Sequence, residues 1–331
     1  MANMQWEDRI GRRLKLRDLH VLFAVVQWGS MAKAARHLSV SQPVVSAAVA
    51  GLEQALGVRL LDRTRRGVEP TMYGRALLDH GLAAFDALRQ GVREIEFLAD
   101  PTVGELRIGC PEWIAAGLLP VIIDRLLQQH PRIVFHVEQT ITATPRFREL
   151  RERSLDLVMG RIVTPFLEQD LQAEVLYEEQ LQVIAGMHSP WARRRKIALS
   201  ELVDEAWLLA PPNELPGSLV AEAFRSSGLQ LPQRRIISFS LHLRNQLLAT
   251  GRYLSVGAPS HFSDVPSLVK ALPVKLPIRP RPVAIVVLKD RTLNSVAKLF
   301  IDCARELTRP LAKASGSTSQ GGVSSRFDTP P

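Results

Sequence analysis

Residues 34–57, with the sequence AARHLSVSQPVVSAAVAGLEQALG, contain two stretches of small and apolar residues that are separated by a polar turn. Ser30 stands where a helix N-cap is expected, so the first stretch predicts a short helix from about residue 31 to residue 38. The turn SVSQP offers hydroxyl groups at Ser39 and Ser41 that would cap the helix ends. The segment therefore predicts two helices joined by a tight turn.

The stretch after the turn predicts a longer helix that ends at Gly57. Pro43 falls in its first turn, where a missing N–H group costs nothing. Apolar residues recur at intervals of four and three positions, which predicts one buried stripe along this helix. The stripe consists of Val45, Val49, Leu52 and Leu56. An apolar segment at residues 16–29 predicts a first helix before these two.

The opposite face of the longer helix carries small or amide-bearing side chains, without the Glu and Lys pairs that are common on a solvated helix. Such a face fits the major groove of DNA, where Gln can bind adenine, Ser can bind phosphate or base, and small apolar groups can meet thymine methyls. The residues that we expect to contact DNA in this region are Ser30, Ser41, Gln42, Pro43, Val44 and Ser46.

Arginines crowd the next segment, VRLLDRTRRGVEPT at residues 58–71. The turn residues Gly and Pro predict a two-stranded wing, with Arg63, Arg65 and Arg66 near its tip. A wing of this kind would bind phosphates or lie in a minor groove. In the alternative interpretation, residues 16–71 form only a helical oligomerisation cap, and the arginines belong to a solvated turn.

The charge distribution also favours a nucleic-acid partner. The 331 residues carry a formal net charge of +9. Residues 1–71 hold eleven Lys and Arg against six Asp and Glu, so more than half of the net charge lies in the N-terminal fifth of the chain. A basic segment that coincides with the predicted helices and wing is the pattern expected for a polyanionic partner.

Residues 29–78, GSMAKAARHLSVSQPVVSAAVAGLEQALGVRLLDRTRRGVEPTMYGRALL, resemble the winged helix-turn-helix of LysR-type transcriptional regulators. The resemblance implies that Gln42, Pro43 and Ser46 face DNA in the groove and that Arg63 belongs to the wing. Many members of that family carry a basic residue where this sequence has Ala47, so one frequent DNA contact is missing here.

The resemblance is strong over about the first 90 residues and continues, by the order and length of the elements, to about residue 312. The Leu-Phe pair that usually precedes the wing arginine is Leu60-Leu61 here, which is a change in packing. The sequence LLDRTRRGVEPTMYG at residues 60–74 is similar to the corresponding segment of the regulators of galactose-binding-protein and protocatechuate genes.

Residues 72–99 predict one long helix. Leu78, Phe85, Val92 and Ala99 recur every seven residues, as in a coiled-coil seam. Leu88 and Ile95 fill the alternate seam, and Gly74 and Gly81 lie on the same line as these two. We expect dimerisation through Leu78, Phe85, Leu88, Val92 and Ile95. Alternatively, the helix packs only on its own domain. The resemblance implies a linker helix that pairs two chains, which would place two recognition helices on two half-sites.

From Glu105 onward, short β-rich runs alternate with helices, which predicts α/β lobes with parallel sheets and two crossings of the chain. The resemblance implies a two-lobed, periplasmic-binding-protein-like (type 2) domain with an effector in its cleft. The predicted fold is therefore α plus α/β. The predicted domains are a winged helix-turn-helix at 1–71, a linker helix and hinge at 72–104, an effector-binding domain at 105–312 (lobe I at 105–176 and 279–312, lobe II at 177–278), and a disordered tail at 313–331.

Ligands of open α/β sheets bind beyond the carboxyl ends of the strands. The residues just after predicted strands are therefore our candidates for effector binding. They are Cys110, Glu112, Trp113, Ile114, Thr140, Thr142, Arg161, Pro212 and Asn213. The backbone N–H groups at residues 112–114 could hold a carboxylate or a hydroxyl group, and the effector is left open between an organic acid and a sugar.

The sequence contains no Gly-x-Ser-x-Gly elbow, Gly-rich phosphate loop or His-Glu-x-x-His motif. Its two cysteines, Cys110 and Cys303, have no metal-ligand spacing. We expect a reduced, cytoplasmic protein without cofactor, metal site, membrane segment or enzymatic activity. The resemblance implies a homodimer or homotetramer that binds promoter DNA and contacts RNA polymerase. Two alternatives are a DNA-binding domain fused to an enzyme and an architectural DNA-binding protein without an effector.

Overall fold

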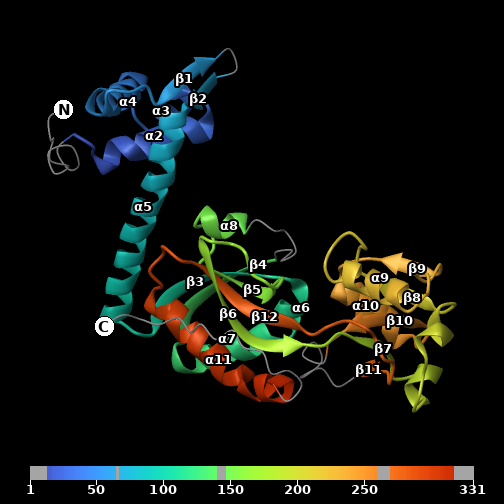
Figure 1. Cartoon of the computed structure of the whole chain (residues 1–331). Coiled ribbons are helices and arrows are strands. Elements are labelled where there is room, and N and C mark those ends of the chain that lie inside the picture. Colours follow the sequence, from blue (N-terminus) through green and yellow to red (C-terminus); the bar gives the residue numbers. More distant parts are fainter. Residues whose placement is uncertain (1–12, 65–66, 140–146, 259–268, 317–331) are drawn as a thin grey trace. The chain divides into compact units, whose positions relative to one another are not determined.

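The structure is a computed structural model that describes residues 13–64, 67–139, 147–258 and 269–316 (Figure 1). The chain divides into two compact units, residues 1–89 and residues 90–331. The division falls inside the long helix and not at the predicted boundary after residue 71, because the first half of that helix packs on the winged domain.

Within the described residues, the N-terminal unit contains three short helices, a two-stranded wing and the start of the long helix, as predicted. The elements are α2 (Leu16–Trp28), α3 (Met31–His37), α4 (Gln42–Leu56), β1 (Leu61–Thr64), β2 (Gly67–Pro70) and α5 (Met72–Ala99). The predicted stripe of α4 faces the core: Val45, Val49 and Leu52 are buried, and Leu56 is partly buried. This burial orients the opposite face of α4 toward solvent.

The predicted capping hydroxyls in the turn between α3 and α4 are wrong. Ser41 does occupy the N-cap position of α4, but its side chain makes no capping hydrogen bond. Ser39 adopts a left-handed conformation with φ of 56°, which closes the turn through the backbone. Val40 N–H donates to the Ala35 carbonyl in this turn at 3.0 Å. The turn is therefore held by main-chain hydrogen bonds, and the Ser41 hydroxyl makes no cap.

The wing docks against the end of α2 through a glycine contact. The Val68 N–H donates to the Gly29 carbonyl at 2.9 Å. Gly67 has φ of 133°, and a Cβ atom added there would lie 2.5 Å from the Gly29 oxygen. Position 67 thus accepts only a residue without a side chain, both for its conformation and for this close approach.

The first half of α5 packs within the N-terminal unit, which corrects part of the predicted dimerisation seam. Phe85 packs edge-on against Phe23, with ring centroids 5.8 Å apart. Leu78 packs against the core of the winged domain. A Cβ atom added at Gly81 would meet the Leu19 side chain at 2.9 Å, so this glycine admits a neighbour from the same chain.

The C-terminal unit contains two five-stranded sheets, which define lobe I and lobe II (Figure 1). The strand order is β4-β3-β5-β12-β6 in lobe I and β11-β7-β10-β8-β9 in lobe II. Lobe I comprises β3 (Val103–Cys110), α6 (Glu112–Ala116), α7 (Leu118–Gln129), β4 (Arg132–Gln139), α8 (Arg148–Arg151), β5 (Leu157–Arg161), β6 (Leu171–Glu179), β12 (Arg281–Leu288) and α11 (Ser295–Gly316). Lobe II comprises β7 (Gln182–Gly186), β8 (Ala206–Leu209), α9 (Gly217–Ser226), β9 (Arg235–Ile237), α10 (Leu241–Ala249), β10 (Tyr253–Gly257) and β11 (Val269–Ala271), with short 3₁₀ helices at Pro190–Arg193 and Leu199–Leu202.

The two lobes and the two crossings of the chain agree with the prediction, but several details do not. The sheets are mixed: β12 runs antiparallel to β5 and β6, and β10 runs antiparallel to β7. Strand β6 continues past residue 176, the predicted end of the first segment of lobe I. The helical segment after β3 is broken at Gly117 into α6 and α7. Helix α11 continues to Gly316, so the predicted disordered tail is helical over its first four residues, 313–316.

Each lobe has its own apolar core. In lobe I, Ile122 of α7 and Phe300 of α11 pack with Ile108 and Ile285 on the sheet. In lobe II, the fully buried Trp207 packs edge-on against Phe224 at 5.6 Å and donates its indole N–H to the Leu202 carbonyl at 2.8 Å. No helix in the described ranges has the length and hydropathy that a membrane span requires.

The last turns of α5 are fastened to lobe I by polar contacts. Arg93 forms an ion pair with Glu105 at 3.0 Å. The Asn294 side-chain amide donates to Gln90 Oε1 at 2.9 Å, and the Ser295 hydroxyl donates to Glu94 at 2.7 Å. The end of the long helix is therefore tied to the start of α11 as well as to β3.

Candidate functional site

The exposed face of α4 is the candidate DNA-binding surface. Gln42, Pro43 and Val44 are exposed at its N-terminal end, and Ser46 is partly exposed. Farther along the helix the exposed positions are Ala47, Ala50, Gly51 and Gln54, none of which carries a charge. A smooth helical surface with one amide at its leading end has the size and polarity that the major groove admits.

The hydroxyl groups near this surface are not used as helix caps. Ser30 is the N-cap residue of α3 and Ser41 that of α4, and neither side chain makes a capping hydrogen bond. The N-terminus of α4 therefore keeps main-chain N–H groups that no cap satisfies, and such groups favour a phosphate. Ser41, Gln42, Pro43, Val44 and Ser46 thus lie at the N-terminal end of α4, whereas Ser30 lies at the start of α3.

The predicted wing residues are described only in part. Arg63 lies in β1 and pairs with Val68 of β2 across the hairpin. Arg65 and Arg66 lie outside the described residues, so their role remains a prediction. Arg59 lies just before β1 and is exposed, and Arg75 at the start of α5 donates to the Pro70 carbonyl at 2.8 Å. Basic side chains therefore stand at the base of the wing.

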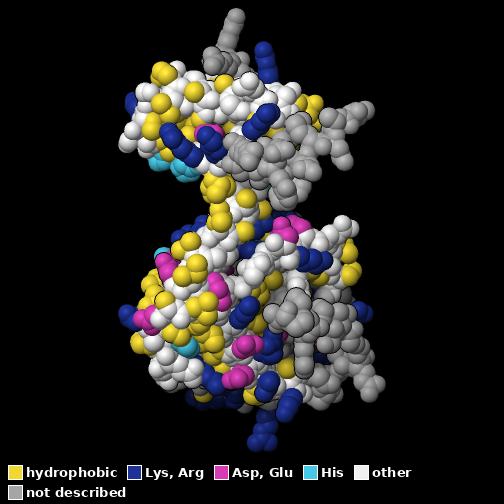
Figure 2. All heavy atoms as spheres, turned by 90° about the vertical axis from the view of Figure 1, so that its left-hand side faces the viewer, with side chains coloured by type: hydrophobic (Ala, Val, Ile, Leu, Met, Phe, Trp, Pro, Cys, Tyr) yellow, Lys and Arg dark blue, Asp and Glu magenta, His cyan; other side chains and the backbone are white. Residues whose placement is uncertain are grey.

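An exposed apolar stripe runs along the second half of α5, and Figure 2 shows hydrophobic side chains gathered along this helix. Leu88, Val92 and Ile95, all predicted seam residues, are 52%, 56% and 69% exposed. Leu98, which the prediction missed, is 72% exposed. The spacing of four, three and three residues places these side chains on one side of the helix, where a second helix could cover them.

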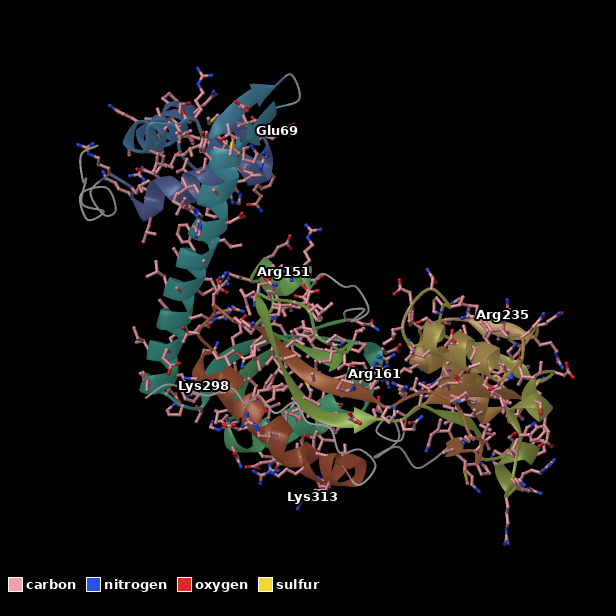
Figure 3. The ribbon with its side chains drawn as sticks, in the orientation of Figure 1. Glu69, Arg151, Arg161, Arg235, Lys298 and Lys313 are labelled. Carbon is pink, nitrogen blue, oxygen red and sulfur yellow. The ribbon has the colours of Figure 1, made fainter. Side chains whose placement is uncertain are left out.

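A small cavity of about 70 Å³ lies in the cleft between the lobes of the C-terminal unit. Figure 3 places the labelled Arg161, from the end of β5, between the two lobes. The described lining residues are Trp113 and Arg161 from lobe I, with Leu181, Leu208, Leu209, Ala210, Pro216, Val220, Ser238, Phe239, Ser240, Leu241, Arg244, Ser255 and Val256. The cavity is thus mostly apolar, with two guanidinium groups among its walls.

Arg161 is held at the base of the cleft by two contacts. Its guanidinium forms a buried ion pair with Glu179, at the end of β6 where the chain leaves lobe I. Its carbon Cζ also lies 4.0 Å from the centroid of the Trp113 ring, a cation–π arrangement. The cleft arginine is therefore connected to the crossing segment of the chain.

A hydrogen bond joins the two lobes across this cleft. The Leu241 N–H, at the start of α10 in lobe II, donates to Glu112 Oε2 of lobe I at 2.8 Å. Arg244, one turn farther along α10, is buried in the same region. Burial lowers the pKa of Arg244 to about 10, while the nearby Glu112 carboxylate acts in the opposite direction and Arg161 adds to the lowering.

The structure brings some of the predicted effector-site residues to the cavity and places others away from it. Trp113 and Arg161 line the cavity, and Glu112 makes the bond across it. Cys110 and Ile114 were wrong, because both side chains are fully buried in the lobe I core. Burial also raises the pKa of the Cys110 thiol to about 11.

The remaining candidates lie elsewhere. Thr140 and Thr142 lie outside the described residues. Pro212 and Asn213 are exposed and are absent from the lining of the cavity as far as the described residues define it. The backbone site predicted at residues 112–114 is also wrong in detail, because α6 has only five residues and the Ile114 N–H donates to the Pro111 carbonyl at 3.0 Å.

The sequence prediction named Pro212 and Asn213 from lobe II but missed the lobe II residues that line the cavity. Arg244 and the segment from Ser238 to Leu241 line the cavity after β9. The available signal was the run RRIISFS followed by a helix, since Ser240 caps α10 by accepting from the Leu243 N–H at 3.2 Å. In the described part of the chain, no group of three or more His, Cys, Asp and Glu side chains could hold a metal ion.

Comparison with known proteins adds two family matches. The description "LysR substrate binding domain" matches residues 99–309, and "Bacterial regulatory helix-turn-helix protein, lysR family" matches residues 16–75. The first match falls within the C-terminal unit, and the second falls within the N-terminal unit.

Individual relatives agree with these matches. The uncharacterized regulator YdcI of Escherichia coli is 28% identical over 92% of this chain and 99% of its own length. The regulator GbpR of Azospirillum brasilense is 29% identical over 88% of this chain and 86% of its own length. The solved structure of a full-length OxyR variant from Pseudomonas aeruginosa, with one cysteine replaced by aspartate, covers 94% of this chain and 99% of its own. It is 24% identical with a TM-score of 0.62, and it supports the fold.

Proposed function

The chain belongs to the LysR family of transcriptional regulators, and we propose which of its residues perform the tasks of that family. It is a sequence-specific DNA-binding protein whose promoter binding responds to a small effector. We propose that the exposed end of α4 enters the major groove and that the wing arginines bind the DNA backbone. The observation that carries this assignment is the exposed, uncharged face of α4 with Gln42 at its N-terminal end.

The dimer is proposed to form through the exposed stripe of α5, which consists of Leu88, Val92, Ile95 and Leu98. Apolar side chains of this size and exposure, in a line along one helix, are covered in a stable protein by another surface. Pairing α5 with its copy would bring two winged domains to two half-sites of DNA.

The effector is proposed to bind in the cleft beside Trp113, Arg161 and Arg244. Because the cavity is lined by both lobes, a ligand there contacts both and changes the free energy of their separation. By reciprocal linkage, the effector and the DNA must then alter the affinity for each other by the same factor.

Three finer assignments complete the proposal. We propose that the chain contacts RNA polymerase when it is bound at its promoter, that it acts in the cytoplasm where the promoter is found, and that it does not act as an enzyme. The similarity of residues 60–74 to regulators of galactose-binding-protein and protocatechuate genes remains a prediction about its target.

Replacing Gln42 with alanine tests the role of α4. Gln42→Ala is expected to cost about 1–3 kcal/mol at one base pair and to relax sequence choice there, because a bidentate base contact is lost. The measurement is a footprint on the DNA upstream of the gene of this protein, with binding to random DNA as the comparison. An equal loss of affinity on both DNAs would contradict the groove assignment.

Arg65→Ala tests the wing. This change is expected to weaken binding to specific and random DNA alike and to reduce the slope of log K against log salt by about one, as for the loss of one phosphate contact. Titrations at several salt concentrations measure the slope. If the slope stays at the wild-type value, residue 65 does not touch phosphate.

A further inference from the structure

Glu112 occupies an unusual place for an acidic side chain in a ligand cleft. It projects from α6 of lobe I, and its carboxylate accepts the Leu241 N–H at the start of α10 in lobe II at 2.8 Å. The N-terminus of a helix carries a partial positive charge and donates N–H groups, so it favours an anion. In this structure the chain itself supplies that anion.

The charges around the cleft also indicate that the chain supplies its own anion there. Two guanidinium groups, those of Arg161 and Arg244, line the cavity. The carboxylate of Glu179 forms the ion pair with Arg161, and that of Glu112 acts electrostatically on Arg244. These two arginines and two glutamates balance in charge, so an added anion would meet a neutral cluster and the like charge of Glu112.

We propose that the cleft contains a carboxylate subsite, made by the start of α10 and Arg244, which Glu112 fills until a small organic monoanion with an apolar body takes its place. This inference rests on the proposed binding of an effector in the cleft and names its chemical class. When Glu112 leaves the start of α10, the hydrogen bond between the lobes breaks. The binding of an anion is therefore coupled to a change in the arrangement of the two lobes.

The lining of the cavity favours an apolar body over a sugar. Leu181, Val220 and Phe239 are apolar walls, and Trp113 presents its ring. The Ser255 hydroxyl is already committed to the Leu208 carbonyl at 2.6 Å. A sugar needs a hydrogen-bond partner for most of its hydroxyl groups, and this lining supplies few.

The size of the cavity requires the cleft to rearrange when a ligand binds. With Glu112 bonded to Leu241, the cavity measures about 70 Å³, which is small for a ligand of several carbon atoms. A ligand carboxylate at the start of α10 must therefore compete with Glu112 for the same N–H group. Removing the charge of Glu112 weakens this competition.

The test compares full-length wild-type protein with Glu112→Gln, which keeps an oxygen acceptor for Leu241 and removes the negative charge. The probes are benzoate and butyrate, with the neutral amides benzamide and butyramide as paired controls. Binding is measured by calorimetry. Glu306→Gln is the matched control variant, because Glu306 also accepts one hydrogen bond at 2.8 Å, from Arg125, but lies on the exposed side of α11.

Glu112→Gln is expected to bind at least one of the two carboxylates about tenfold more tightly than wild type does, the size expected for one partly buried like charge. The amides are expected to bind both proteins equally, and Glu306→Gln is expected to match wild type. In the Glu112→Gln background, Arg244→Met is expected to remove the gain.

Three results would overturn the inference: neither carboxylate binds any variant, Glu112→Gln binds carboxylates no better than wild type, or the amides gain as much as the carboxylates. The footprint of wild type beside Gln42→Ala separates this failure from failure of the proposed function. If the footprint is sequence-specific and the carboxylates fail, only the chemical class and the role of Glu112 are lost.

Discussion

Asp156→Ala is expected to lower the free energy of unfolding of the C-terminal unit by about 3–5 kcal/mol, the cost of leaving buried charge without its partner. Asp156 is buried, and its carboxylate pairs with Arg291 at 2.7 Å and with Arg93 at 3.6 Å. It also accepts the Arg107 N–H of β3 at 2.8 Å. The change therefore leaves two arginines and a main-chain donor without this carboxylate.

Urea unfolding of the full-length protein, followed by circular dichroism, measures the loss, and hydrogen exchange of the β3 amides locates it. Asp170→Ala is the control, because Asp170 pairs with Arg151 at 2.6 Å on the surface, where it is 47% exposed. An exposed pair of this kind contributes up to about 1 kcal/mol. Equal losses in the two variants would mean that Asp156 does not organise the charges at the end of α5.

The double change Val92→Glu and Ile95→Glu is expected to convert the proposed α5-paired dimer to a monomer. Four charges would then face one another across the proposed helix pair, in place of apolar side chains that the pairing would cover. Because a dimer binds its second half-site at a high effective concentration, loss of pairing is expected to reduce promoter affinity by about 10²–10⁴-fold.

Light scattering after size exclusion measures the mass, and a footprint measures the affinity. The control is Leu167→Glu, which also adds a charge at a highly exposed apolar residue, 79% exposed, but lies outside α5. A variant that stays dimeric at the wild-type concentration would assign the exposed stripe of α5 to some other partner.

The winged domain was predictable because its signals are local. The periodic residues Val45, Val49 and Leu52 lie within two turns of one helix, and the positions of turns follow from nearby Ser, Pro and Gly residues. The prediction that serine hydroxyls cap the helix ends was wrong, because the residue types alone do not give the conformation of the turn. Ser39 takes a left-handed conformation, and main-chain hydrogen bonds then close the turn without its side chain.

The cleft was only partly predictable because the direction of a side chain depends on its neighbours in space. Residues at the end of β3 and just after it were chosen together, yet Cys110 and Ile114 turn into the core while Trp113 turns toward the cavity. Arg244 comes from another lobe, and no spacing in the sequence relates it to Arg161. Likewise, the alternation of strands and helices cannot tell that β12 enters its sheet antiparallel to β5.

The position of β12 has a consequence for the order in which the protein is made. This strand lies between β5 and β6 in the lobe I sheet, although more than a hundred residues separate it from β6 in the chain, most of them in lobe II. A ribosome therefore releases all strands of lobe II before the lobe I sheet can close. Until then β5 and β6 have open edges, so a chain terminated before residue 281 would expose both to aggregation, even with lobe II complete.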